Sequence, residues 1–346
     1  MAGVAGWELA AAVKDAGGMG FLGSGPITGE SLTAEAEKAR RALNLSDDED
    51  LPLGVGVLTW YFESPQVPGS PSEVEEVGDF NLREILFSAR ARYIWLSFSI
   101  EGADGLAKWV ERVRRIEREG PREGAQERER KGRVKVLVVV QDEEAGRKAR
   151  EWDVDAVIAQ GTEAGGHGAT LSAGAPLLSL LRALSPLYSN TAPPFLLGAG
   201  GLSSPTSITA AFSFGAAAVV TGTALEVASE SRLPAAQKAL LVAAEGDATL
   251  KGAVFDLARD GRNRWPEGVH GRALRNVTSA EEGEAEAMAE RYRRAVEEKD
   301  TERIITWAGV VRFLDSPLFS LVAGANVKDV KAIRPAKDIV RELMGL

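Results

Sequence analysis

The residues that could carry chemistry gather in one glycine-rich segment, 159–169, which reads AQGTEAGGHGA. It contains His167, one of two histidines in the chain, and the absence of cysteine excludes thiol chemistry. Glycines at this density let a backbone approach a ligand closely. The apolar run 156–161 predicts a strand, so we expect His167 in a loop at its end. We interpret this imidazole as catalytic; the alternative is a structural histidine in a tight turn.

Two further strand ends carry glycine and together predict a phosphate site. They are 197–202 (LGAGGL), which precedes a helix expected from 204, and 219–224 (VVTGTA). Exposed backbone N–H groups and helix N-termini favour bound anions. In barrels the last two strands commonly hold the phosphate. A GxGxxG fingerprint with its downstream acid, a Walker motif, HExxH and GxSxG are not found.

Three other groups are weaker candidates, each with a competing interpretation. Glu163 could pair with His167 or with a ligand, or it could face solvent. The aromatic run 60–62 could wall a ligand pocket, or it could pack beneath a long loop. We expect His270 at the surface or behind the site.

Short apolar runs alternate with amphipathic stretches, which predicts a parallel sheet covered by helices. The expected strands are 18–23, 51–59, 93–98, 134–140, 156–161, 194–200 and 217–223. The expected helices are 7–16, 33–42, 103–118, 142–150, 176–184 and 204–214. A closed TIM-type (β/α)8 barrel needs eight strands. Seven are counted, and the missing one should precede the helix at 7–16, so we expect that the first barrel strand is absent from this chain.

The chain divides into three parts by pattern. Residues 1–224 form the β/α barrel, 225–303 an inserted, mainly helical smaller domain, and 304–346 a return to the barrel that ends in a helix. Segment 281–299 is expected to be a strongly charged helix. Two stretches are expected to be solvated: 64–79, rich in Pro, Ser and Glu, forms a loop, and 112–133, with mixed charges, forms a helix end and loop.

Composition excludes several classes of function. The net charge is −9 and the pI about 5.1, so nucleic acid is not an expected partner. The chain holds no apolar run of about 18 residues, so we expect no membrane span. We see no secretory signal and expect a cytoplasmic location. No motif indicates a metal site.

The histidine segment resembles the signature loop of the nitronate monooxygenases, formerly called 2-nitropropane dioxygenases. MAGV before a helix with AGGMGFLGSG resembles the family's opening, and 197–225 resembles its paired phosphate loops. Segments 274–276 and 333–344 also match, and fungal-type members are the most similar branch. The resemblance implies an FMN-binding barrel with a smaller inserted domain.

The family's chemistry is the oxidation of nitronates or nitroalkanes with O2 to carbonyl compounds and nitrite. By motif match His167 would be the catalytic base, or would hold the anionic nitronate. The implied cofactor-binding residues are Ala2, Gly3, Gly56, Gln160, Gly165, Gly200, Gly201, Val220, Thr221, Gly222 and Thr223. Gly56 stands where many relatives have asparagine. An apolar piece, 310–322, interrupts the family's closing pattern; it is either an extra helix or an inclusion.

Two alternatives remain open from sequence. An FMN-dependent reductase of quinones or enoyl thioesters, using NAD(P)H, has the same barrel and similar loops. A chain lacking one strand could also be a non-catalytic flavin or phosphate binder, because loss of a strand exposes two sheet edges. The physiological substrate and the oligomeric state, monomer or dimer, are not determined by sequence.

Overall fold

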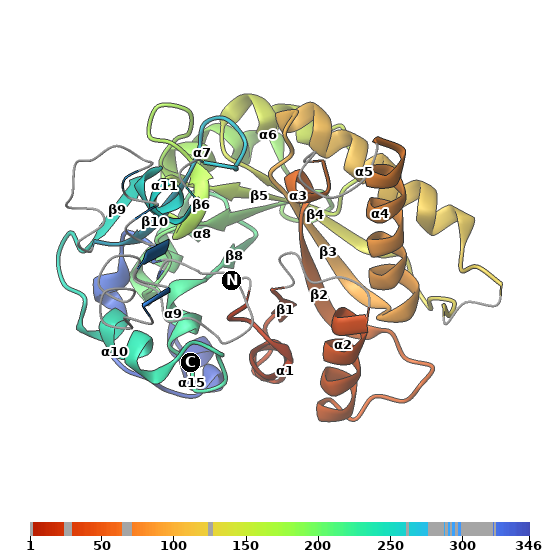
Figure 1. The fold of residues 1–346 in the computed structure, drawn as a ribbon, viewed down its shortest axis with the longest axis horizontal. Coiled ribbons are helices and arrows are strands. Elements are labelled where there is room, and N and C mark those ends of the chain that lie inside the picture. Colours follow the sequence, from red (N-terminus) through yellow and green to blue (C-terminus); the bar gives the residue numbers. More distant parts are fainter. Residues whose placement is uncertain are drawn as a thin grey trace.

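A curved parallel sheet of seven strands forms the body of the molecule in a computed structural model (Figure 1). The structure describes residues 3–23, 30–63, 71–123, 127–260, 263–275, 287, 290, 293–294, 297–298, 321 and 323–346. The strands lie in the order β1-β2-β3-β4-β5-β7-β8. Their bounds are β1 Phe21–Leu22, β2 Leu51–Leu58, β3 Ala91–Ser97, β4 Lys135–Val140, β5 Ala156–Gln160, β7 Phe195–Ala199 and β8 Ala218–Val220.

All seven expected strands are confirmed, each within the predicted range or shifted by at most two residues at its ends. Every neighbouring pair is parallel. Their continuous apolar runs suit this sheet, since each strand is buried on both faces. Because all the strands point the same way, their carboxyl ends meet at one edge.

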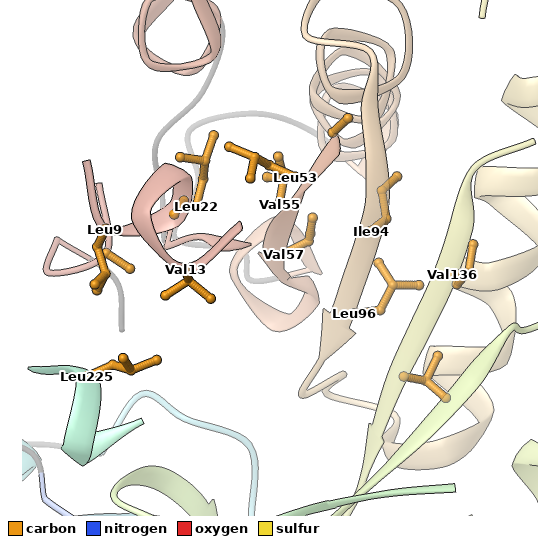
Figure 2. Packing of buried hydrophobic residues seen from close by; sticks show 14 of the residues in the cluster. Leu9, Val13, Leu22, Leu53, Val55, Val57, Ile94, Leu96, Val136 and Leu225 are labelled. Atoms are coloured by element: carbon orange, nitrogen blue, oxygen red, sulfur yellow. The ribbon is translucent and has the colours of Figure 1, made fainter. Parts of the chain in front are cut away.

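Alternate residues of the strands fill two apolar layers. In β4, Val136 and Val138 face the outer helices, and Leu137 and Val139 face the inside of the curve. Figure 2 shows part of the outer layer, where side chains of neighbouring strands lie in a row. The inner layer continues through Ile158 on β5. This alternation fixes which strand-end side chains point into the mouth of the curved sheet.

Helices cover the outer face of the sheet and agree with the predicted pattern. Their bounds are α1 Trp7–Asp15, α2 Glu30–Ala42, α3 Thr59–Glu63, α4 Pro71–Arg83, α5 Gly102–Glu119, α6 Glu143–Ala149, α7 Leu177–Leu184, α8 Pro205–Ser213, α9 Thr223–Glu226, α10 Ala235–Ala243, α11 Val254–Asp260 and α15 Ala336–Leu343. The described residues also form a π-helical turn at Glu84–Ser88 and 3-10 turns at Ser185–Leu187 and Val327–Asp329. No helix in the described ranges is long and apolar enough to cross a membrane.

The ring is open in the strand layer and bridged in the helix layer. Within the described residues no strand lies between β1 and β8, so both strands are sheet edges, as the count of seven predicts. Outside this gap α1 contacts α15. Arg232, which follows β8 and α9, bonds Glu8 of α1 at 2.8 Å and Glu35 of α2 at 2.6 Å. These ion pairs tie the two sides of the opening together.

A second, antiparallel sheet stands beside the carboxyl edge. Its order is β6-β10-β9, with β6 at Gly166–Ala169, β9 at Thr249–Gly252 and β10 at Val269–Leu274. The expectation that His167 lies in a loop is therefore wrong, because its segment pairs with β10. Segment 225–303, expected to be mainly helical, contributes α9, α10 and α11 but also these two strands.

The two expected solvated stretches differ in outcome. Within 64–79 the expectation of a loop is wrong from residue 71 onward, where α4 begins; buried Leu82 and half-buried Val77 anchor that helix on the core. The stretch 112–133 is a helix end and loop, as predicted, since α5 ends at Glu119. The charged helix at 281–299 and the apolar piece 310–322 lie almost wholly outside the described residues.

The side chain of Glu226, at the end of α9, places a carboxyl group in the interior of the protein. It is 3 % exposed, and its Oε2 atom has no hydrogen-bond partner in the described part of the chain. Burial raises the pKa of this carboxyl from 4.5 to about 7. Between pH 4.5 and about 7 this carboxyl is protonated in the folded state and ionised in the unfolded state. Its contribution to stability is therefore lost as pH rises through about 7.

We predict that Glu226→Gln raises the melting temperature near pH 8 by roughly 2–6 °C and leaves it almost unchanged near pH 4, because glutamine resembles the neutral acid. Thermal unfolding followed by circular dichroism across this range measures the effect. Glu267→Gln, at an exposed glutamate, is the matched control. An equal gain at both pH values would contradict the buried-carboxyl explanation.

Candidate active site

The predicted ligand-binding residues collect at the carboxyl edge of the parallel sheet. Gly56 lies near the end of β2 and Gln160 ends β5. Gly200 and Gly201 follow β7, and the run 220–223 ends β8 and begins α9. Ligands bind at this end of the strands in parallel barrels. The Gly3 N–H donates to the Gly23 carbonyl at 3.4 Å, which places Gly3 near the end of β1. Ala2 is outside the described residues.

The imidazole of His167 is held by a carboxylate from the neighbouring subdomain. His167 stands opposite Gly271 of β10, and its Nε2 lies 3.1 and 3.0 Å from the two carboxylate oxygens of Asp256 on α11. Asp256 is 2 % exposed. A carboxylate accepts hydrogen bonds, so Nε2 carries the proton and Nδ1 carries the ring's lone pair. This arrangement makes Nδ1 the basic atom of the pair.

An aromatic cluster covers one face of this imidazole. The Trp265 ring stacks on His167 with centroids 3.7 Å apart and planes 11° apart. Trp60, at the end of β2, and Phe98, at the end of β3, contact Trp265 at 4.9 and 5.3 Å. The aromatic run 60–62 therefore divides: Trp60 belongs to the site wall, whereas buried Phe62 packs outward on Trp109.

The turn between β5 and β6 is fixed by two charged side chains. Glu163 accepts from the Leu177 N–H at 3.2 and 3.0 Å and so caps the start of α7. Of the open interpretations of Glu163, pairing with His167 is not what the structure shows. Arg272 of β10 donates to the Thr162 carbonyl at 3.2 and 3.1 Å. These bonds fix the turn that leads from β5 to His167 on β6.

The β7 end forms a tight glycine turn. Gly200 and Gly201 have φ of 116° and 68°, in the left-handed region that favours glycine. A Cβ on Gly200 would lie 3.0 Å from the Ala164 nitrogen. The Gly201 carbonyl accepts from Asn326 at 2.7 Å, and Ser204 caps α8. Packing against the protein's own chain thus accounts for both glycines.

The hydroxyls of the two threonines at the end of β8 differ in their hydrogen bonding. Thr223 Oγ1 accepts from the Gly324 N–H at 2.9 Å, so this hydroxyl binds the protein itself. Thr221 Oγ1 is buried and has no hydrogen-bond partner within the described residues. A buried hydroxyl without a partner is costly, and a phosphate oxygen would satisfy it. Thr221 is the observation that best fits a bound phosphate here.

Two predicted glycines differ in what surrounds them. A Cβ on Gly165 would lie 2.6 Å from the Ala323 carbonyl carbon and the Gly324 nitrogen, so contact with the chain itself requires glycine there. A Cβ on Gly56 would lie 3.8 Å from the Leu22 carbonyl oxygen, which is ordinary contact. Packing among described residues therefore does not require glycine at 56, which is compatible with a ligand passing close to it.

His270 takes no part in the imidazole's surroundings. It pairs with Gly168, one position along β10 from Gly271, and so faces the opposite side of the small sheet from His167. It is half-buried, on the face of the small sheet toward which Lys251 of β9 also points.

Sequence reasoning missed three residues of this region: Asp256, Trp265 and Lys251. All three belong to 225–303, where polar and aromatic residues at irregular spacing carry no signal of their own. The one available clue was that a lone catalytic histidine commonly has a carboxylate partner. No groups of three or more metal-ligating side chains occur in the part of the chain that the structure describes.

Comparison with known proteins agrees with this geometry. The family model described as nitronate monooxygenase matches residues 106–345. A nitronate monooxygenase of Neurospora crassa is 27 % identical over 98 % of this chain and 85 % of its own length. A nitroalkane oxidase from Streptomyces ansochromogenes superposes with TM-score 0.66 at 24 % identity, over 99 % of this chain and 92 % of the other. FabK from Thermotoga maritima gives 0.65 at 20 %, over 100 % and 89 %.

The family model covers well over half of the chain, and the solved structures confirm the β/α barrel type of fold, here with seven parallel strands. The chain belongs to the nitronate monooxygenase family and is a flavin-type oxidoreductase acting on small molecules.

Proposed function

We propose that this protein binds FMN at the carboxyl edge of the sheet and oxidises nitronates and nitroalkanes with O2. The observation that carries the proposal is the His167–Asp256 pair at the same edge of the sheet as the glycine turns after β7 and β8, in a chain of this family. Two nitronates and one O2 balance to two carbonyl compounds and two nitrite ions. Electron transfer is the chemistry that bound FMN supplies.

The residues of the chain handle charge and protons. Nδ1 of His167 takes a proton from the carbon next to the nitro group of a neutral nitroalkane. Asp256 stabilises the imidazolium that results, which then holds the nitronate anion by charge. Trp265 and Trp60 keep water from one face of the ring. A preformed nitronate needs no proton removal and depends less on this pair.

The FMN phosphate is assigned to the β7 and β8 ends. Thr221 would donate its hydroxyl to the phosphate, and the backbone N–H groups of Gly200, Gly201 and Gly222 in the two turns are the proposed further donors. Thr223 acts indirectly, because its hydroxyl holds Gly324. Gly3, Gly56, Gln160 and Val220 remain predicted contacts of the same cofactor, as do Ala2 and Gly165.

We predict that purified protein is yellow or becomes yellow with FMN, and that a nitronate bleaches it under anaerobic conditions. The flavin absorbance measures the reaction. Rapid bleaching by NADH with no response to a nitronate would instead favour a reductase of quinones or enoyl thioesters. Protein that stays colourless with added FMN would favour a non-catalytic chain.

We predict that His167→Ala lowers kcat for a neutral nitroalkane by about 10²-fold or more and that Asp256→Asn lowers it by at least about tenfold, with FMN affinity unchanged in both. With preformed nitronate the loss in Asp256→Asn should be much smaller, because no proton is removed. Steady-state oxygen consumption measures both substrates. Asp338→Asn, at an exposed aspartate, is the control. Equal losses on the two substrates would show that Asp256 is only structural.

We predict that Thr221→Val raises the Kd for FMN about tenfold without lowering the melting temperature of the apoprotein, because the lost hydroxyl has no partner within the described chain. Thr223→Val should lower that melting temperature, since it removes the bond to Gly324. Fluorescence titration with FMN and thermal unfolding separate the two. An unchanged Kd in Thr221→Val would remove this hydroxyl from the phosphate site.

A further inference from the structure

Lys251 of β9 places a buried ammonium group at the mouth of the curved sheet. Its Nζ atom is inaccessible to solvent and has no hydrogen-bond partner in the described ranges. Burial, with a smaller effect of nearby Arg272, lowers the pKa of this lysine from 10.5 to about 8. Three donor hydrogens without a buried acceptor are costly, so the position favours an acceptor that the described residues do not supply.

Two glutamine amides surround the same position. Gln141 follows β4 and Gln160 ends β5, and alternation from Val139 and Ile158 points both side chains inward. Gln141 Nε2 donates to Gln160 Oε1 at 2.6 Å, and Gln160 Nε2 reaches the His167 carbonyl at 3.4 Å. The group is therefore linked directly to the strand that carries the imidazole.

Gly168 lies close to all three of these groups. A Cβ built on it would lie 3.1 Å from Lys251 Nζ, 3.2 Å from Gln141 Nε2 and 3.2 Å from Gln160 Oε1. The Lys251 ammonium and the Gln141 amide thus both lie beside Gly168, and the acceptor nearby, Gln160 Oε1, already receives an N–H of Gln141. Such a set of donors suits an oxygen that carries negative charge.

The charges that face Lys251 do not neutralise it. Arg272 on β10 is a second cation, and Glu163 is the carboxylate that acts on both. The Glu163 oxygens bind the N–H of Leu177 at the start of α7. Arg275 and Asp247 act on Arg272 from farther along the two strands. Two cations, Lys251 and Arg272, thus share one carboxylate, and this balance favours an incoming anion.

We propose that Lys251, with the Gln141 amide, is an anion-binding position that takes a negatively charged oxygen of the bound reactants. Two sources carry this chemistry: the nitronate oxygen of the substrate, and the pyrimidine oxygen of reduced flavin. The identity of the reactants rests on the proposed function, whereas anion binding by Lys251 does not.

The test uses FMN-loaded protein titrated with inorganic nitrite, an anion of the same kind as the nitronate head, while the flavin spectrum is recorded. We expect Lys251→Met to raise the Kd for nitrite at least tenfold, and Lys251→Arg to keep it within a few-fold of the original. Lys337→Met, at an exposed lysine of α15, should match the unchanged protein. Nitrite binding that depends on Lys251 assigns the substrate as the source, even if nitronates are not turned over.

A second measurement on the same variants distinguishes the flavin as the source. If Lys251 faces the flavin, Lys251→Met keeps its nitrite affinity but loses at least tenfold in affinity for reduced FMN relative to oxidised FMN. Either loss supports the anion position. If Lys251→Met matches the unchanged protein in both titrations and remains folded by circular dichroism, the proposal is wrong.

Dependence on pH supplies an independent check. The ammonium is lost as pH rises through about 8, so the Kd for nitrite should be flat below that pH and rise roughly tenfold per pH unit above it. Lys251→Arg should remove this rise, because a guanidinium keeps its charge. A pH profile that is the same in Lys251→Arg as in the unchanged protein would show that another group controls binding.

Discussion

The arrangement of the site depends on a short backbone segment, 323–326, that runs across three strand-end loops at once. The Ala325 N–H binds the Glu163 carbonyl at 2.9 Å, Gly324 binds Thr223, and Asn326 binds Gly201. Each bond reaches a different loop, following β5, β8 or β7. A side chain at Gly165 would collide with this segment, so its glycine is explained by the clamp. Loops held this way keep fixed positions relative to one another, which a preorganised site requires.

The groups around the imidazole come from different parts of the fold. His167 lies on β6, which follows the barrel strand β5, whereas α11 and the segment before β10 supply Asp256 and Trp265. The barrel alone would hold a histidine without fixing its tautomer or ring plane. Asp256 fixes the first by accepting from Nε2, and Trp265 fixes the second by stacking.

Three of the buried polar groups that have no hydrogen-bond partner among the described residues lie in two different settings. Thr221 and Lys251 both lie at the ligand edge, where a phosphate and an anionic oxygen would satisfy them. Glu226 lies in the core, where burial raises the pKa of its carboxyl and keeps it neutral up to about pH 7. Buried polar groups without a partner lower the stability of the unliganded protein, and such groups are common at functional sites. Glu226 lowers stability without an evident gain.

The sequence by itself determined the number, parallel direction and approximate bounds of the seven strands, because each is a continuous apolar run between helical patterns. It also located the two glycine turns and His167, since glycine at a strand end has a local conformational meaning. Tertiary structure decided what the local pattern does not encode. The helix at 71–83 depends on burial of Leu82, and strand β6 depends on pairing with β10, which is about a hundred residues away. Asp256 lies 89 residues from His167 in the chain, and such a contact has no periodicity to reveal it. Only the folded chain brings the carboxylate, the tryptophan and the buried lysine to the same strand ends.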